Sequence, residues 1–362
     1  MHRRNSPPVL SLLQRLVVNM SGIPPGAPGR AAVLCGVGGR LPERVVSNAE
    51  LSARLETTDE WITTRTGIRN RRAAAPGEAT SDLAVAAGRR ALDAAGGEPA
   101  DTVLVATVTP DRRCPATAPL VAARLGLTGA AAFDVSAVCT GFLYGLATAA
   151  GLIAAGVSTR VLLIGADVYS SVVDPTDRTN AIIFGDGAGA VVLRAGSPDE
   201  PGAVGHFDLG SDGGAEEAIL IAAGGSRSPL TAQTPRADRH FAMRGKEVYR
   251  QAVTRMTASA RTTLAAAGWH PDDVDHLVAH QANLRILHSV ADGLGVARER
   301  CARHLVDVGN TGAASIPLAL DDAHATGALT PGARVLLTGF GGGLTWGSCA
   351  LRWPDLSPAT DR

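Results

Sequence analysis

The chain has 362 residues, which suffices for one large domain or two ordinary ones with a well-buried core. Hydrophobic residues make up 45% of the sequence and charged residues 19%, so this is a globular protein and not a disordered one. The 34 basic and 34 acidic residues balance, and this bulk charge argues against general binding to nucleic acid or to a membrane surface.

Five cysteines are scattered along the sequence: Cys35, Cys114, Cys139, Cys301 and Cys349. Their odd number and the lack of any C-x-x-C pair speak against a disulfide framework and against a zinc site. We therefore expect a reducing, cytoplasmic location and no metal.

Residues 1–29 are expected to form a loosely ordered extension, rich in Pro and Gly near its end. The extension makes a poor signal peptide, because Gln14 and Arg15 interrupt its apolar stretch and no A-x-A cleavage site follows. No later apolar run resembles a membrane span, since the longest, 141–157, is short and rich in Ala and Gly. Residues 357–362 are expected to form a short tail.

The stretch FDVSAVCTGF (133–142) ends an apolar run at Cys139. The segment 140–156 that follows carries no charged side chain and is predicted to be a helix buried on every side. A thiol at a helix N-terminus meets unpaired N–H groups and the positive end of the helix dipole, which favour the reactive thiolate. Gly141 would let the helix pack closely. On this stretch alone, a buried structural cysteine remains the alternative.

Two resemblances within the sequence indicate that the chain is built twice. RVLLIGAD (160–167) returns as RVLLTGFG (334–341), an offset of 174 residues. The segments 91–110 and 263–283 both read as a helix end, a Gly stop, a Pro-Asp turn and a buried strand, with an offset of 173 residues. Two separate landmarks with nearly one offset predict an internal duplication.

Two polar residues of the second half stand at comparable junctions. His280 ends the apolar strand in HLVAHQANLRIL, and Asn310 lies between a strand-like stretch and a helix of small residues in VGNTGAASIPLAL. In the repeat, His280 falls opposite Thr107 and Asn310 falls near the counterpart of Cys139, so equivalent junctions from the two halves could converge on one site. Taken singly, a hydrogen-bonded loop histidine and a turn or cap asparagine are the alternatives.

The glycine run GFGGGLTWGS (339–348) follows a strand and exposes backbone N–H groups, which suits an oxyanion hole. A phosphate loop is excluded because no G-K-[ST] follows. The alternation of helices with apolar strands predicts α/β architecture, with mostly parallel sheets covered by helices. We expect two halves, 30–200 and 201–356, that form a layered body with helices sandwiched between two sheets.

From about residue 30 to 354 the chain resembles β-ketoacyl-acyl carrier protein synthase III, a family of thiolase-fold condensing enzymes. The resemblance rests on TTDEWITTRTGIRNRR, DVSAVCTGF, DPTDR, IIFGDGAGA, HQANLRI, GNTGAAS and GFGGGLTWG, which occur in the family's order. It implies a thiolase-like fold with two duplicated α/β halves in an αβαβα body, and a homodimer.

The resemblance also implies a catalytic triad of Cys139, His280 and Asn310. The cysteine would take the acyl group from an acyl-CoA primer. Malonyl on acyl carrier protein would then lose CO2, while His280 and Asn310 donate hydrogen bonds to the enolate oxygen. The N–H groups of Cys139 and Gly342 would form the oxyanion hole, and Phe340 would shield the malonyl carboxylate from water. Metal ions and redox cofactors have no part in this chemistry.

Seven positions match coenzyme A contacts of the family: Thr57, Trp61, Arg65, Arg178, Tyr249, Ala282 and Asn283. Trp61 and Arg178 would sandwich the adenine, and Tyr249 would line the pantetheine tunnel. Arg285 and Arg250 would dock the acidic carrier protein. Surface ion pairs and a solvated helix face are the alternatives for these arginines.

Cys114 departs from the family pattern, because relatives often carry a bulky Phe there that reaches toward the partner subunit's acyl pocket. The smaller side chain leads to the hypothesis of a wider pocket and of a primer larger than acetyl. Residues 205–235 also diverge and are expected to form mobile loops that cover the pocket.

Three other functions remain open at this point. The first is acyl transfer to another acceptor without decarboxylation, the second is a cysteine hydrolase, and the third is a non-catalytic carrier-protein or assembly subunit. The retained His280 and Asn310 favour condensation, since simple acyl transfer has no enolate to stabilise. The sequence does not decide between a fatty acid and a polyketide pathway.

Overall fold

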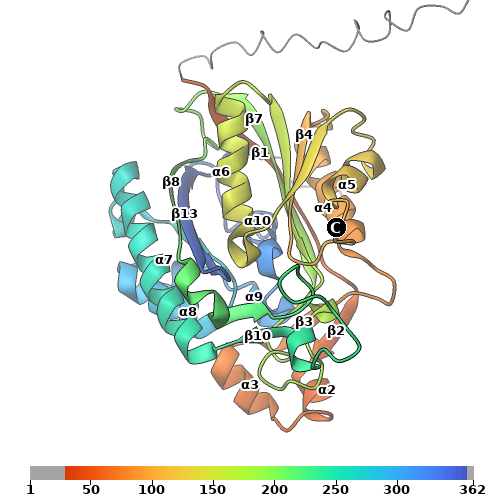
Figure 1. The fold of residues 1–362 in the computed structure, drawn as a ribbon. Coiled ribbons are helices and arrows are strands. Elements are labelled where there is room, and N and C mark those ends of the chain that lie inside the picture. The colour runs from red at the N-terminus through yellow and green to blue at the C-terminus, as the bar shows by residue number, and fades with distance from the viewer. Residues whose placement is uncertain (1–28, 357–362) are drawn as a thin grey trace, which may run out of the picture.

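The computed structural model describes residues 29–356. The predicted terminal segments, 1–29 except its last residue and 357–362, lie outside the described residues. Two sheets with helices between and around them make up the body (Figure 1). Among residues 29–356, no helix combines the length and the apolarity that a membrane crossing requires.

The first sheet has the strand order β1-β7-β6-β4-β5. Its strands are β1 Ala31–Arg40, β4 Thr102–Ala106, β5 Ala131–Val135, β6 Arg160–Asp167 and β7 Gly187–Gly196. The strand β4 is buried along its whole length, as its unbroken apolar sequence requires. At the edge of the sheet, β5 is only partly covered.

The second sheet has the order β11-β12-β13-β8. Its strands are β8 Gly205–Ser211, β11 His276–Ala279, β12 Arg334–Gly341 and β13 Thr345–Arg352. In the first sheet Val161 of β6 lies opposite Thr102 of β4, and in the second Val335 of β12 lies opposite His276 of β11. Each of these parallel pairs joins residues 59 positions apart, so the register confirms the internal duplication.

The prediction of mostly parallel sheets is wrong, because both sheets are mixed. β7 runs antiparallel to β6 and β1, and β13 runs antiparallel to β12 and β8. The physical reason is the connection length, since β12 and β13 are joined by residues 342–344 alone. A link that short forms a hairpin, whereas a parallel pair needs a crossover of a dozen residues or more.

Three helical layers enclose the sheets (Figure 1). Helices α6 Gly141–Ala154 and α10 Ser315–Ala325 lie between the sheets, and their apolar side chains share one core cluster with both sheets. Helices α4 Thr80–Ala94 and α5 Ala118–Arg124 cover the outer face of the first sheet, and α7 Gly245–Ala267 and α8 Leu284–Leu294 cover the second. The expected αβαβα body is thereby confirmed.

The central helix α6 departs from its prediction of burial on every side. Phe142, Leu143 and Leu146 are buried, but Tyr144 is only half-buried and Gly151 is exposed. These last two residues lie on one helical face together with Thr148. Small and polar groups carry little apolar area, so this face loses little by remaining in contact with solvent.

Smaller elements gather around the C-terminal ends of the central strands. They are β2 Arg44–Ser47, β3 Asn70–Ala73, β9 Ile219–Ile221, β10 Phe241–Met243, α2 Asn48–Ser52, α3 Asp59–Thr66 and α9 Leu305–Val308. The segment 205–235 is not wholly loop, as expected, because it contains β8 and β9. In α3 the side chain of Thr58 accepts a hydrogen bond from Trp61 N, which fixes the helix start beside the outer cavity described below.

Candidate active site

Cys139 lies in a short 3₁₀ turn, Val138–Thr140, between β5 and the start of α6. Val138 has φ 48°, a left-handed conformation that is unfavourable for a β-branched residue and marks this turn as strained. Strand β12 presses against the turn, since a Cβ atom on Gly341 would lie only 2.9 Å from Cys139 N. The glycine at 341 therefore permits the close approach of β12 to the nucleophile.

The thiol of Cys139 is 7% exposed. Burial raises its pKa to about 12, and the nearby charge of Asp167 acts in the same direction. The Tyr169 hydroxyl, 3.8 Å from Cys139 Sγ, opposes this shift through a hydrogen bond. The expected position before a helix is confirmed, but the expected thiolate is wrong for the resting site, because desolvation outweighs the helix dipole.

Asp167 ends β6 and is fully buried beside the site. Its carboxylate accepts hydrogen bonds from Val108 N and Ala313 N at 2.8 Å each, and from Thr107 Oγ1 at 3.1 Å. Burial raises the pKa of Asp167 to about 7. This side chain joins the two halves of the fold behind the nucleophile.

His280 follows β11 and is 3% exposed. Its Nδ1 lies 2.7 Å from Ser315 Oγ, which also accepts a hydrogen bond from Gln281 N at 3.2 Å. We assign the Ser315 hydroxyl proton as donated to Nδ1, which leaves the ring proton on Nε2. Burial lowers the pKa of His280 to about 4, so the imidazole is neutral near pH 7.

Asn310 is held by three hydrogen bonds that use its backbone and its side-chain oxygen. Its N donates to Ile183 O and its O accepts from Gly185 N, both at 2.9 Å. Its Oδ1 accepts from Gly312 N at 2.9 Å. Because Oδ1 is occupied in this way, the side-chain amide group is left as a hydrogen-bond donor.

Cys139, His280, Asn310 and Phe340 line one small inner cavity of about 40 Å³. The predicted nucleophile comes from the first half of the chain and its three companions from the second. Most of the other lining residues are apolar, among them Phe184 and Phe241. The structure thus brings together the residues that the sequence placed at separate junctions.

The glycine run forms the hairpin between β12 and β13. Thr345 Oγ1 donates to Gly342 O at 3.1 Å and lies 2.7 Å from Thr140 Oγ1. These contacts fix the turn that contains Gly342 next to the nucleophile turn.

An outer cavity of about 590 Å³ opens onto this inner one. The two cavities share Met243, Val248, Ala282, Ile286 and Asn310 as lining residues. Of the predicted binding residues, the outer cavity is lined by Trp61, Arg65, Tyr249, Ala282, Asn283 and Arg285. A substrate with a long arm could therefore reach Cys139 from this side.

At the mouth of the outer cavity, two guanidinium groups lie over the Trp61 ring. Arg178 is 5.4 Å and Arg65 is 5.5 Å from the ring centroid, within cation–π range. Arg178 also donates to Glu56 O at 2.7 Å, which orients it. The Thr57 hydroxyl is buried and has no hydrogen-bond partner among residues 29–356, and it is not part of the cavity lining.

The two predicted docking arginines differ in position. Arg285 is exposed at the cavity wall, 5.7 Å from the Tyr249 ring centroid, whereas Arg250 is exposed on α7 outside the cavity lining. Cys114 is exposed and does not line the inner cavity of its own chain. Its contribution to a partner subunit's pocket stays a prediction.

Sequence reasoning missed three residues of this site: Tyr169, Ser315 and Lys246. Lys246 lines the outer cavity, and its spacing of three residues from Tyr249 on one helix was the signal that could have found it. Ser315 ends the motif GNTGAAS. Tyr169 directly follows an apolar strand, where site residues of α/β proteins gather.

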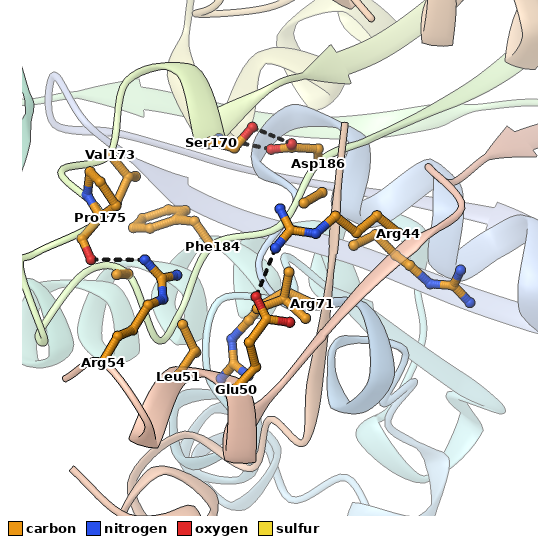
Figure 2. Close-up of a pocket in the computed structure, with 14 residues that line it drawn as sticks. Arg44, Glu50, Leu51, Arg54, Arg71, Ser170, Val173, Pro175, Phe184 and Asp186 are labelled. Atoms are coloured by element: carbon orange, nitrogen blue, oxygen red, sulfur yellow. Dashed lines mark hydrogen bonds and ion pairs between the residues drawn. The ribbon is translucent and has the colours of Figure 1, made fainter. Parts of the chain in front are cut away.

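A further cavity of about 390 Å³ lies against the same phenylalanine from outside, because Phe184 lines both this cavity and the inner one. Figure 2 shows Arg44 reaching Glu50 and Arg54 reaching the Pro175 carbonyl across it. The buried Arg71 donates from Nε to Ile182 O at 3.0 Å. These arginines hold the segment around Ile182 and Phe184 that also forms the wall of the active-site cavities.

Two family models match the chain. Residues 133–213 match 3-oxoacyl-[acyl-carrier-protein] synthase III, and residues 264–353 match the C-terminal part of that synthase. The chain is similar to β-ketoacyl-[acyl-carrier-protein] synthase III 3 of Streptomyces coelicolor, with 58% identity over 91% of this chain and 99% of the relative. The Pseudomonas aeruginosa β-ketoacyl-[acyl-carrier-protein] synthase III is 52% identical over 92% and 99%.

Solved structures agree with these similarities. The 3-oxoacyl-(acyl carrier protein) synthase III of Pseudomonas aeruginosa superposes with a TM-score of 0.85 at 51% identity, covering 91% of this chain and all of that chain. A priming β-ketosynthase from a polyketide biosynthetic pathway superposes with a TM-score of 0.83 at 38% identity, covering 90% and 97%.

Proposed function

Since the chain belongs to the β-ketoacyl-acyl carrier protein synthase III family, we propose that its inner cavity performs the family's condensation with Cys139 as nucleophile. The reaction joins an acyl-CoA primer to malonyl-acyl carrier protein with loss of CO2 and starts a fatty acid or polyketide chain. The observation that carries the assignment of residues is the convergence of Cys139, His280 and Asn310 on one cavity.

The first half-reaction loads the nucleophile. Cys139 sulfur attacks the thioester carbonyl of acyl-CoA, the acyl–sulfur bond to coenzyme A breaks, and the thiol proton leaves with coenzyme A. Backbone N–H groups of Cys139 and Gly342 would stabilise the oxyanion of the tetrahedral intermediate. Because the resting thiol has a raised pKa, we infer that it loses its proton only as the thioester binds.

The second half-reaction forms the carbon–carbon bond. Malonyl thioester loses CO2, and the electron pair of the broken bond becomes an enolate. The ring proton on His280 Nε2 and the Asn310 amide would donate hydrogen bonds to the enolate oxygen. The enolate carbon then attacks the acyl-cysteine, which releases the ketoacyl product and the Cys139 thiolate. Phe340 makes this cavity apolar, and an apolar site favours release of neutral CO2 over a buried carboxylate.

Substrate entry is assigned to the outer cavity. Trp61, with Arg178 and Arg65 over its ring, suits the adenine and phosphates of coenzyme A, and Tyr249, Ala282 and Asn283 suit the pantetheine arm. Thr57 completes this proposed set. Acyl carrier protein would dock at the same mouth through Arg285 and Arg250, and the thioesters themselves bring the activation that a resident cofactor would otherwise supply.

A homodimer is proposed on the basis of strand β5. It stands at the end of the first sheet with one edge unpaired among the described strands, and Phe133 on it is 39% exposed. An open edge with exposed apolar side chains is suited to pairing with a second copy. A cytoplasmic location follows from the unpaired cysteines and stays a prediction.

The alternative is a thiolase-fold acyltransferase that moves the acyl group to an acceptor without decarboxylation. The buried, neutral His280 beside Asn310 favours condensation, because these two donors have no role in simple acyl transfer. A hydrolase is disfavoured because the apolar inner cavity is too small to offer an open water path. A non-catalytic subunit is disfavoured by the retained nucleophile.

One experiment separates these functions. The protein is incubated with acyl-CoAs and then with malonyl-acyl carrier protein, and both proteins are weighed intact by mass spectrometry, with Cys139→Ala as control. Condensation predicts an acyl mass on Cys139 and then a ketoacyl mass on the carrier. An acylated enzyme with no ketoacyl product would support the acyltransferase instead, and an unreactive Cys139 would support the non-catalytic subunit.

A further inference from the structure

Tyr169 lies closer to the nucleophile than any role assigned so far explains. It follows β6 in a 3₁₀ turn, Tyr169–Ser171, and is fully buried. Its hydroxyl is 3.8 Å from Cys139 Sγ. The inner cavity lies on the side of the sulfur that faces His280, Asn310 and Phe340, and Tyr169 is not part of its lining. The tyrosine therefore occupies another side of the sulfur.

Two phenylalanines hold the ring of Tyr169 in place. It stacks on Phe184 with centroids 4.5 Å apart, and it meets Phe241 edge-on at 5.5 Å. The two phenylalanines are 4.9 Å apart and both line the inner cavity. Three rings in mutual contact form a closed aromatic wall beside the nucleophile.

Gly312 blocks the remaining direction of movement. A Cβ atom there would lie 2.4 Å from Tyr169 Cε2, which shows that the ring packs directly on the backbone of this turn. Gly312 has φ +58°, a conformation that favours glycine. Since backbone on one side and Phe184 on the other confine the ring, it cannot rotate away to admit a long acyl chain.

The space around the sulfur must be divided between two groups during condensation. The malonyl unit needs the side with His280 and Asn310, so the acyl chain on Cys139 must extend elsewhere. The inner cavity holds only about 40 Å³, close to the share of one or two water molecules in the liquid. A methyl or ethyl group fits such a space, whereas a longer chain meets the aromatic wall.

We propose that Tyr169 is the specificity-determining residue of the acyl site, closing it to primers longer than two or three carbons. The inference rests on the proposed function, because it assumes that Cys139 carries the primer. It opposes the hypothesis drawn from Cys114, which is exposed in this chain and lies outside the inner cavity.

The test measures single-turnover acylation of Cys139 by acetyl-, butyryl- and hexanoyl-CoA, followed by intact mass spectrometry. The full chain is compared with Tyr169→Leu, Tyr169→Met and Tyr169→Phe. Tyr144→Phe is the matched control, since its hydroxyl bonds Gly210 O at 2.8 Å on α6, and it should change nothing. Cys114→Phe tests the competing hypothesis.

For the unaltered chain we expect acylation by hexanoyl-CoA to be at least about 10-fold slower than by acetyl-CoA, the scale set by a few excluded methylenes. Tyr169→Leu should raise the hexanoyl-to-acetyl ratio about 10-fold or more, and Tyr169→Met should do so less. Tyr169→Phe keeps the ring and should leave the ratio unchanged. Cys114→Phe should also leave it unchanged.

Two results would overturn the inference. One is equal acylation by acetyl- and hexanoyl-CoA in the unaltered chain, a measurement that needs no variant to fold. The other is an unchanged ratio in folded Tyr169→Leu and Tyr169→Met. Either result with ketoacyl product still formed refutes only the role of Tyr169, whereas no acylation by any of these CoA thioesters would refute the proposed function itself.

Discussion

Replacing Ser315 with alanine tests how His280 is prepared for its proposed role. The change removes the hydroxyl that lies 2.7 Å from His280 Nδ1 and leaves Gln281 N without its side-chain acceptor. Without that hydroxyl, nothing holds the ring proton on Nε2 or the ring plane toward the inner cavity. The enolate would then lose a well-oriented donor.

The size of the effect follows from one buried hydrogen bond. A net contribution of about 0.5–1.5 kcal/mol corresponds to a roughly 2- to 13-fold slower condensation step. The unsatisfied Gln281 N–H should also lower the free energy of unfolding by about 1–3 kcal/mol. Acylation of Cys139 uses neither donor, so its rate should stay within about 2-fold.

Rapid-quench mass spectrometry separates the two steps, because acyl-cysteine and ketoacyl-carrier protein differ in mass. Ser158→Ala is the matched control: Ser158 is also buried and lies 2.6 Å from Thr102 Oγ1 at the far end of the first sheet. It should lower stability without slowing condensation. Equal slowing of both steps in Ser315→Ala, or no slowing of condensation, would refute the reasoning about His280.

Three further predictions concern the cavity mouth, the thiol and the subunit contact. Arg178→Ala should raise KM for acyl-CoA about 2- to 5-fold with kcat unchanged, the scale of one exposed cation–π contact, whereas Arg298→Ala on the far-side pair with Asp292 should not change it; an unchanged KM in both would remove Arg178 from the binding site. Because burial raises the pKa of Cys139 to about 12 and only the thiolate reacts, alkylation of the free enzyme by iodoacetamide should rise about tenfold per pH unit between pH 7 and 9, and a plateau below pH 8 would contradict this. Phe133→Asp on the open edge of β5 should yield monomers in analytical ultracentrifugation if that edge pairs with a second copy, and an unchanged sedimentation coefficient would exclude β5 as the contact.

The sequence was sufficient for those parts of the site that depend on local pattern. The apolar strand before His280 and the uncharged helix after Cys139 located both residues at strand or helix ends, and the repeat indicated that they converge. Family resemblance supplied the roles of Phe340 and Gly342. All of these features can be recognised in segments of fewer than twenty residues.

What the sequence did not predict depends on contacts between distant segments. The direction of the Cys139 pKa shift is set by the whole apolar cavity around the sulfur, and a helix position alone gives the opposite sign. The aromatic wall joins Tyr169, Phe184 and Phe241 from three separate loops and strands. No local pattern marks such a cluster, just as none marked the exposure of Cys114.

The duplicated halves treat one equivalent position in opposite ways. Asp167 ends β6 and accepts a hydrogen bond from Ala313 N at the turn before α10, at 2.8 Å. The repeat places Gly341 opposite Asp167 and Cys139 opposite Ala313, 174 residues apart in both cases. A carboxylate therefore caps the backbone amide in one half, and a bare glycine faces it in the other. A symmetric ancestor with the acid in both copies would have had no vacant amide to offer a substrate, so losing a side chain created a binding position in only one of two otherwise equivalent turns.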